Sequence, residues 1–340
     1  MIHFTGDINL TDWNFSVGFG TGTKIKNGLN PFKYLDRKKE DLWVGNFEGV
    51  SASNSDYKGM YGKAFRILPN DLAKIKHFDV YGFANNHAME HGAAAYEETV
   101  NTLESFGCKV FGQKKHHSVQ ITHKAKLISI TGICFRIEQY KQEPLYWYNP
   151  EYKDIEEEVK QLPQDAFKVL FVHWGNEFIN RPSAAQKKFA HWLIDAGFDL
   201  IIGMHPHVLQ GYEDYNGGRI YYSLGNLVFE MPSEQCKIGA IVNLDFVGNK
   251  PVYSEDYVRI NEESCPHIVS ESDIPLNWRF EYLNERLKID DNTEEYHTEI
   301  TRGYLVYRKA NRKQLFVSAF LHPNSFSKVL MDFVKRKIGK

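Results

Sequence analysis

The 340-residue sequence contains few cysteines and no long apolar run. Its four cysteines are widely spaced and form no Cys-x-x-Cys pair: Cys108, Cys134, Cys236 and Cys265. This spacing suggests neither a disulfide framework nor a zinc ribbon, and it fits a reducing compartment. Nowhere do about 18 apolar residues follow one another, so we expect no transmembrane segment.

The N-terminus also lacks the features of a secretory signal. Residues 1–7 lead directly into a strand-like segment, without a basic region followed by a long apolar stretch. Charge of one sign is not in excess, because 41 Lys and Arg stand against 43 Asp and Glu, a formal net charge of −2. Such a balance gives no overall attraction to nucleic acid or to an anionic membrane. We therefore expect a cytoplasmic protein without a nucleic-acid partner, in which any anionic ligand is bound by local groups.

The composition is that of an ordinary globular protein, with 42% apolar and 25% charged residues. Up to about residue 247, short apolar runs alternate with polar turns and helical stretches, which predicts an α/β domain over residues 1–247. The predicted strands are Ile2–Phe4, Leu42–Val44, Val80–Phe83, Leu127–Ile130, Val169–Val172 and Leu200–Ile202. The predicted helices are Ala93–Phe106, Ile155–Gln161 and Ala184–Ala196.

The pattern changes after Gly248. A polar, acidic stretch runs to Glu295 and is followed by a strand-like segment, Gly303–Tyr307, and by a basic, amphipathic end, Phe326–Lys340. We expect residues 248–340 to form a small C-terminal appendage.

Five short segments carry the residues suited to chemistry, and each follows an apolar, strand-like run. They are Gly6-Asp7-Ile8-Asn9, Gly45-Asn46-Phe47-Glu48, Ala84-Asn85-Asn86-His87, Val172-His173-Trp174-Gly175-Asn176-Glu177 and Gly203-Met204-His205-Pro206-His207. In open α/β sheets, ligands bind outside the carboxyl ends of the strands, because loops from several strands meet there. The five segments are therefore expected to converge.

Their side chains suit divalent metals. Carboxylate and amide oxygens together with imidazole nitrogens are ligands for manganese, iron or zinc. One carboxylate can bridge two such ions about 3.5–4 Å apart, and the pair can lower the pKa of a bridging water. We expect a site for two divalent metal ions.

The order and content of the five segments resemble the CapA-type bacterial capsule-synthesis family, associated with poly-γ-glutamate capsules, within the calcineurin-like metallophosphoesterase superfamily. The resemblance spans about residues 3–229 and includes Pro182, Gln186, Gly197, Gln210 and the run Tyr222-Ser223-Leu224-Gly225-Asn226. It implies an α/β fold in which a two-sheet sandwich is flanked by helices.

The resemblance also implies roles for individual positions. Asp7 and His207 would bind the first metal, and Glu48 would bridge both metals. The second site would be completed by Asn86, His173 and His205. His87 would stabilise the transition state or protonate the leaving oxygen. Other residues could support these ligands or add one: Asn9, Asn46, Asn85, Glu90, Glu177 and Asn226.

Three positions depart from the superfamily pattern. Asn9 stands where a histidine is usual, which would weaken the first metal site. Glu48 replaces the usual bridging aspartate, a variation associated with the capsule branch. Glu90 stands where the family's Asn-Asn-His is typically followed by an aspartate, and its longer side chain could reposition His87.

Each residue also has a structural interpretation. Asp7 could cap a helix or form a turn, and Asn85-Asn86 could simply be a turn. His87 could be a structural histidine bonded to Glu90, and Glu177 could be a surface charge.

The sequence thus predicts a metal-dependent hydrolase linked to capsule or exopolysaccharide biosynthesis. Its substrate would be an anionic small molecule or polymer, and other capsule-synthesis proteins would be its partners. The alternative is a non-catalytic accessory protein of capsule polymer assembly that keeps the metal fold as a scaffold.

Overall fold

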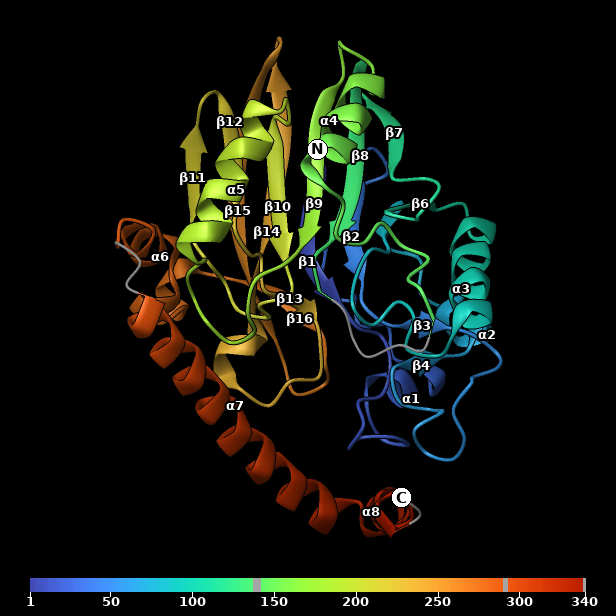
Figure 1. Cartoon of the computed structure of the whole chain (residues 1–340). Coiled ribbons are helices and arrows are strands. Elements are labelled where there is room, and N and C mark those ends of the chain that lie inside the picture. Colours follow the sequence, from blue (N-terminus) through green and yellow to red (C-terminus); the bar gives the residue numbers. More distant parts are fainter. Residues whose placement is uncertain (137–141, 290–292, 339–340) are drawn as a thin grey trace.

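The computed structural model describes residues 1–136, 142–289 and 293–338, and it contains two β-sheets that pack face to face with helices on their outer faces (Figure 1). The predicted α/β class and two-sheet sandwich are confirmed.

The first sheet has eight strands in the order β16-β15-β14-β1-β2-β5-β6, with β13 paired to β1. They are β1 (Ile2–Ile8), β2 (Leu42–Phe47), β5 (Val80–Gly82), β6 (Lys109–Phe111), β13 (Asn226–Val228), β14 (Ile238–Val247), β15 (Lys250–Ile260) and β16 (Pro266–Val269). β1, β2, β5 and β6 are parallel, so their carboxyl ends lie at one edge of the sheet.

The second sheet has six strands in the order β11-β12-β10-β9-β8-β7. They are β7 (Ser118–His123), β8 (Lys126–Cys134), β9 (Phe167–His173), β10 (Leu200–Met204), β11 (Tyr212–Tyr215) and β12 (Gly218–Tyr221). β8, β9, β10 and β12 are parallel to one another. A separate pair, β3 (Val50–Ser51) and β4 (Arg66–Ile67), lies beyond the end of β2.

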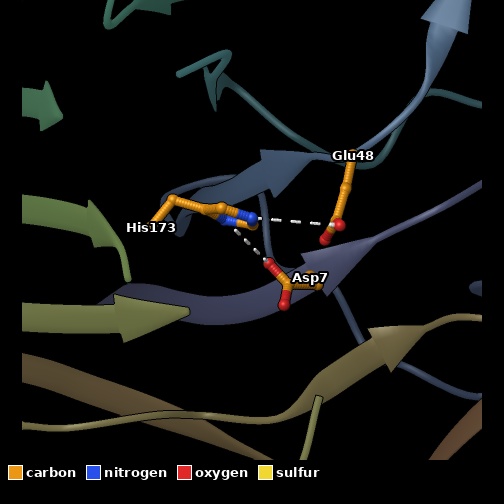
Figure 2. A group of neighbouring side chains, drawn as sticks. All are labelled: Asp7, Glu48 and His173. Atoms are coloured by element: carbon orange, nitrogen blue, oxygen red, sulfur yellow. Dashed lines mark ion pairs between the residues drawn. The ribbon is translucent and has the colours of Figure 1, made fainter. Parts of the chain in front are cut away.

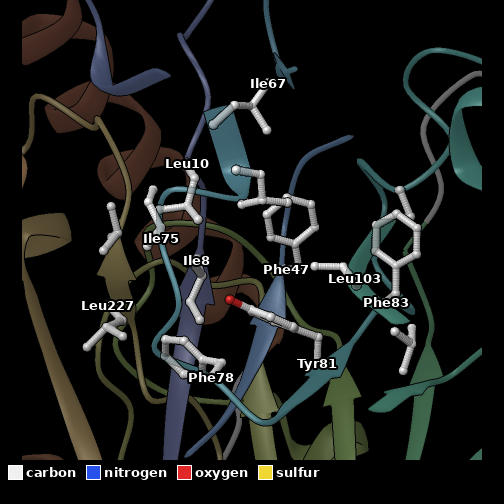
Figure 3. Packing of buried hydrophobic residues seen from close by; sticks show 14 of the residues in the cluster. Ile8, Leu10, Phe47, Ile67, Ile75, Phe78, Tyr81, Phe83, Leu103 and Leu227 are labelled. Carbon is white, nitrogen blue, oxygen red and sulfur yellow. The ribbon is translucent and has the colours of Figure 1, made fainter. Parts of the chain in front are cut away.

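The main core lies between the two sheets. Phe4 of β1 meets Phe171 of β9 with ring centroids 5.8 Å apart, and Phe111 of β6 meets the same ring at 5.3 Å. Alternate residues of the strands point the other way and pack against helices. Figure 3 shows part of this second layer, in which Phe47, Tyr81 and Phe83 belong to one buried cluster.

Helices cover both outer faces. Those of the main body are α1 (Thr21–Lys26), α2 (Pro69–Leu72), α3 (Ala93–Ser105), α4 (Tyr152–Gln161), α5 (Ala184–Asp195) and α6 (Phe280–Arg286), with short 3-10 turns η1 (Glu234–Lys237), η2 (Glu271–Asp273) and η3 (Leu276–Trp278). α3 packs on the first sheet, and α4 and α5 pack on the second. The six strands predicted within residues 1–247 and all three predicted helices overlap observed elements.

The C-terminal part differs from the expectation in two respects. β15 and β16 lie beyond Gly248 and extend the first sheet, so part of the predicted appendage belongs to the sandwich. The predicted strand Gly303–Tyr307 is wrong, because these residues lie inside α7 (Thr293–Leu321), which is followed by α8 (Pro323–Ile338). The apolar run Tyr304–Val306 is short enough to resemble a strand, but Gly303 and Tyr307 are buried four residues apart on one helical face. Among the described residues, no helix has both the length and the apolarity required to cross a bilayer.

Candidate metal centre

Two acidic side chains meet where neighbouring strands of the first sheet end. Asp7 is the penultimate residue of β1, and Glu48 follows directly after β2. Because β1 and β2 are parallel and Asp7 pairs with Asn46, both carboxylates reach the same edge. Both residues are fully buried. Burying two carboxylates is costly unless positive charge compensates them, so this edge favours a cation.

The ends of the second sheet supply three histidines to the same place. His173 is the last residue of β9, and His205 and His207 follow β10, which runs parallel beside it. His173 Nδ1 lies 3.9 Å from Asp7 Oδ1, and its Nε2 lies 4.0 Å from Glu48 Oε1 (Figure 2). Ligand atoms of Asp7, Glu48 and His173 all lie within 4.8 Å of one another, a group that could hold a metal ion.

His207 and His205 complete the group. His207 Nδ1 lies 3.5 Å from Asp7 Oδ2, and its Nε2 lies 3.7 Å from Glu48 Oε1. The backbone N–H of His205 donates to Asp7 Oδ2 at 3.0 Å, while His205 Nδ1 lies 3.1 Å from His173 Nε2. His205 and His207 have φ angles of 94° and 57°, a region that residues other than glycine rarely occupy. Such strain is typical of functional sites, where the surrounding structure holds it.

Amide side chains surround these ligands. Asn46 donates to Asp7 Oδ1 at 2.8 Å, and Asn85 donates to Asn46 Oδ1 at 3.1 Å. Asn86 Oδ1 lies 2.7 Å from His173 Nε2, and Asn226 Oδ1 lies 2.9 Å from His207 Nδ1. The amides therefore connect both sheets and fix the orientation of the carboxylate and the imidazoles.

Asn9 forms its side-chain hydrogen bonds within the turn that follows β1. Its Oδ1 accepts from the backbone N–H of Thr11 at 2.9 Å and from the Thr11 hydroxyl at 2.7 Å. Asn9 therefore stabilises the turn after β1 with the oxygen that would otherwise be available to a metal.

His87 lies beside the acidic pair on the more open side. Its ring stacks on Phe65 with centroids 4.2 Å apart, and its Nδ1 lies 2.9 Å from Glu90 Oε2. Its Nε2 lies 3.8 Å from Glu48 Oε1, and its side chain is 14% exposed. A carboxylate can only accept a hydrogen bond, so Glu90 fixes the hydrogen on Nδ1 and orients the ring.

Glu177 stands at the margin of the group and is held by a residue that the sequence analysis missed. Its Oε1 lies 4.0 Å from His207 Nε2, and its Oε2 accepts from the Tyr304 hydroxyl at 2.7 Å. Tyr304 lies on α7, 127 residues further along the chain. No motif surrounds Tyr304, so only the course of α7 could have identified it.

Close backbone approach fixes Asp7 in place. A Cβ at Gly6 would lie 1.9 Å from the carbonyl oxygen of Gly225, so only glycine fits there. That same carbonyl accepts from the N–H of Asp7 at 3.0 Å. The glycine in the first motif is thus required by the loop that precedes β13.

The electrostatics of the group match the needs of a metal. Burial lowers the pKa of His173 and of His205 well below the usual value. Burial also lowers the pKa of His207, although the negative charge of Asp7 raises it in part. Burial raises the pKa of Asp7, an effect that His207 and Asn46 oppose. The imidazoles are therefore neutral near pH 7 and keep lone pairs for ligation.

One atom tests this fit directly. Within residues 1–136, 142–289 and 293–338, His205 Nε2 is buried and has no hydrogen-bond partner. Most buried polar atoms have a hydrogen-bond partner, and a nitrogen without one beside two carboxylates is in a position to bind a cation. The donor set and this nitrogen fit a divalent metal.

The chain has relatives of known name. The family model described as "Bacterial capsule synthesis protein PGA_cap" matches residues 1–231. The chain is 30% identical over 258 residues to the PGA biosynthesis protein CapA of Bacillus subtilis (strain 168), a match covering 70% of this chain and 66% of that protein. It is 30% identical over 225 residues to the capsule biosynthesis protein CapA of Bacillus anthracis, covering 60% of this chain and 54% of that protein. The chain thus spans about two thirds of the first relative and about half of the second.

Two solved structures are also similar. A phosphatase from Mycoplasma pneumoniae aligns over 76% of this chain and 92% of its own, with a TM-score of 0.45 and 13% identity. A hypothetical protein from Thermus thermophilus aligns over 75% of this chain and 98% of its own, with a TM-score of 0.44 and 14% identity.

Proposed function

The chain belongs to the bacterial capsule synthesis family PGA_cap, and from this premise we propose that it is a metal-dependent hydrolase of capsule polymer synthesis. Its substrate would be a phosphoester, or a bond in an anionic capsule polymer or its precursor. Two Bacillus relatives named for PGA and capsule biosynthesis support the biological setting. The observation that carries the chemistry is the meeting of two buried carboxylates with three neutral imidazoles at one edge of the sandwich.

We assign the ligands the roles that the family resemblance implies. The site would hold two divalent ions, of manganese, iron or zinc. Asp7 and His207 would hold the first ion, and Glu48 would be shared by both. The second ion would also be held by Asn86, His173 and His205. When bound, such ions lower the pKa of a water and neutralise charge that develops on the substrate. The surrounding amides keep the ligands oriented, and burial keeps the imidazoles neutral.

His87 is the residue that we assign to proton transfer. Glu90 holds its Nδ1–H, so Nε2 faces the interior beside Glu48. In its doubly protonated form, His87 would donate the Nε2 proton to the leaving oxygen or stabilise charge on it. Its partial exposure, like that of Glu177, marks the side from which a substrate would enter.

The test combines metal content and turnover. The full chain, loaded with Mn²⁺, should hydrolyse p-nitrophenyl phosphate or its diester, and His205→Ala should lose both metal and turnover. His116→Ala is the matched control, since His116 is exposed and is not one of the residues that meet in the group. Loss of turnover in the control as well, or unchanged turnover in His205→Ala, would refute the assignment.

A second candidate is a non-catalytic accessory protein of capsule polymer assembly. It is favoured by Asn9, whose oxygen is engaged by Thr11, because this leaves the first metal position with fewer ligands. Metal bound without turnover of either phosphoester would support this candidate over the hydrolase.

A further inference from the structure

The charge of the chain is distributed very unevenly. Residues 301–340 contain ten Lys and Arg but one acidic residue, Asp332, a net charge of +9. The whole chain carries −2, so residues 1–300 carry −11. The basic segment comprises most of α7 and all of α8, which we call the C-terminal arm.

Acidic residues are scarce along residues 301–340, so the cations of the arm have few partners nearby. In the body, lysines such as Lys33, Lys124 and Lys237 form ion pairs with acidic residues. Within the described part of the arm, six exposed cations form no ion pair: Arg302, Arg308, Lys309, Arg312, Lys313 and Lys328. Their positive potential is therefore not compensated within the chain.

Large apolar side chains lie among these cations on the outer surface. Phe316 and Phe320 are 78% and 80% exposed, and they share one helical face because they are four residues apart. Leu305, also on α7, is 60% exposed. α8 continues the pattern with exposed residues Leu330, Met331 and Val334. Isolated exposed apolar residues are ordinary, but a row of them between unpaired cations is not.

The opposite face of α7 holds the arm in place. Gly303, Tyr307 and Ser318 are buried, and the Tyr307 ring stacks on Phe178 with centroids 4.1 Å apart. At the far end of α7, His322 stacks on Phe19, also at 4.1 Å. α7 runs past the end of the sandwich at which β1 and β10 finish, and α8 lies at its far end (Figure 1). The outward face therefore belongs to a docked helix.

From these features we infer that the C-terminal arm binds the surface of an anionic lipid bilayer. A helix with Phe and Leu among Lys and Arg lies in the plane of a membrane interface, with its apolar groups among the acyl chains. The long stems of Lys and Arg reach from there to the lipid phosphates. A nucleic acid or a soluble acidic polymer would satisfy the cations but leave Phe316 and Phe320 in water. Two arms of separate copies would repel one another, since both outer faces are basic.

Membrane binding would also orient the rest of the molecule. α7 carries Tyr304, whose hydroxyl donates to Glu177 beside His207. A membrane-bound arm would therefore hold the candidate metal centre close to the bilayer. This last step rests on the proposed function, whereas the binding itself does not.

The experiment is co-sedimentation of the full chain with vesicles. Vesicles of phosphatidylcholine with about one third phosphatidylglycerol should bind the chain, and pure phosphatidylcholine should bind it far less. Each basic residue near an anionic surface contributes about fivefold, so Lys309→Glu with Lys313→Glu should weaken binding by at least about 25-fold. Phe316→Ser with Phe320→Ser should weaken it by roughly tenfold or more. Raising the salt to about 1 M should also release the chain, because the Debye length falls to about 3 Å.

Matched controls lie on the body. Lys39→Glu with Lys188→Glu removes the same charge from exposed positions, and Val247→Ser with Leu276→Ser removes exposed apolar groups. Both control pairs should bind like the unmodified chain. Equal losses in controls and arm variants would overturn the inference. Binding of RNA or poly-γ-glutamate without vesicle binding would also overturn it. The same holds for a dimer in solution that Phe320→Ser converts to monomer. Turnover of p-nitrophenyl phosphate is measured without vesicles. Loss of turnover therefore reports on the hydrolase assignment, and co-sedimentation reports on lipid binding.

Discussion

Glu48→Gln should change the stability of the protein in opposite directions with and without metal. Without a cation, Asp7 and Glu48 are two buried carboxylates whose ligand atoms lie within 4.8 Å. Two unit charges at this separation repel by about 3 kcal/mol at an effective dielectric constant of about 20. Proton uptake by the pair relieves part of this repulsion, because burial raises the pKa of Asp7. In chelator, the variant should therefore melt roughly 2–6 °C above the unmodified chain.

With metal bound, the unmodified chain should be more stable than Glu48→Gln. A ligand at about 1,000 times its Kd stabilises the folded state by about 4.1 kcal/mol, provided that the binding site is intact. The unmodified chain should gain this stabilisation from Mn²⁺, whereas Glu48→Gln should gain little. Differential scanning calorimetry in chelator and in Mn²⁺ measures both effects, and Glu281→Gln, an exposed carboxylate on α6, is the control that should respond like the unmodified chain. A variant that is less stable in chelator, or that gains as much from Mn²⁺ as the unmodified chain, would show that Glu48 is not a metal ligand held against its charge repulsion with Asp7.

Three further results are expected. His87→Ala should keep its metal but lose about 10²–10⁴ in kcat, with less damage to p-nitrophenyl than to alkyl esters; parallel metal analysis and kinetics check this, and metal loss would make His87 a ligand or a structural residue. Gly6→Ala should unfold at clearly lower denaturant concentration, because its Cβ would meet Gly225 O at 1.9 Å; an unchanged midpoint would contradict that contact. Burial lowers the pKa of His77 to about 4. The free energy of unfolding should therefore fall by about 3 kcal/mol between pH 6.5 and about 4, because the unfolded chain takes up a proton that the folded chain does not. Urea titrations at both pH values should show a smaller fall in His77→Leu.

Much of the site could be predicted because its residues follow short apolar strands. Asp7, Glu48, His173 and His205 each lie at the carboxyl end of a parallel strand, and parallel strands bring such ends to one edge. The position of each residue at the end of a predicted strand was therefore enough to predict that the residues lie close together. That these residues bind metal stays a prediction.

Other parts could not be predicted, for identifiable reasons. The role of Asn9 depends on a turn with Thr11, which motif comparison does not reveal. Tyr304 reaches Glu177 only because α7 passes beside the margin of the site, and the apolar neighbours of Tyr304 resemble a strand. β15 alternates exposed and half-buried residues over much of its length, so its polar sequence suggested an appendage. The net charge of −2 concealed the opposite charges of the body and the arm.

Elemental analysis of the full chain, purified without chelator near pH 7, decides whether the five motifs bind metal. The expected result is two equivalents of manganese, iron or zinc per chain, and a strong reduction in His205→Ala, whose Nε2 is a buried nitrogen with no hydrogen-bond partner in the described structure. Protein that contains no divalent metal, and takes up none on incubation with Mn²⁺ or Zn²⁺, would contradict it.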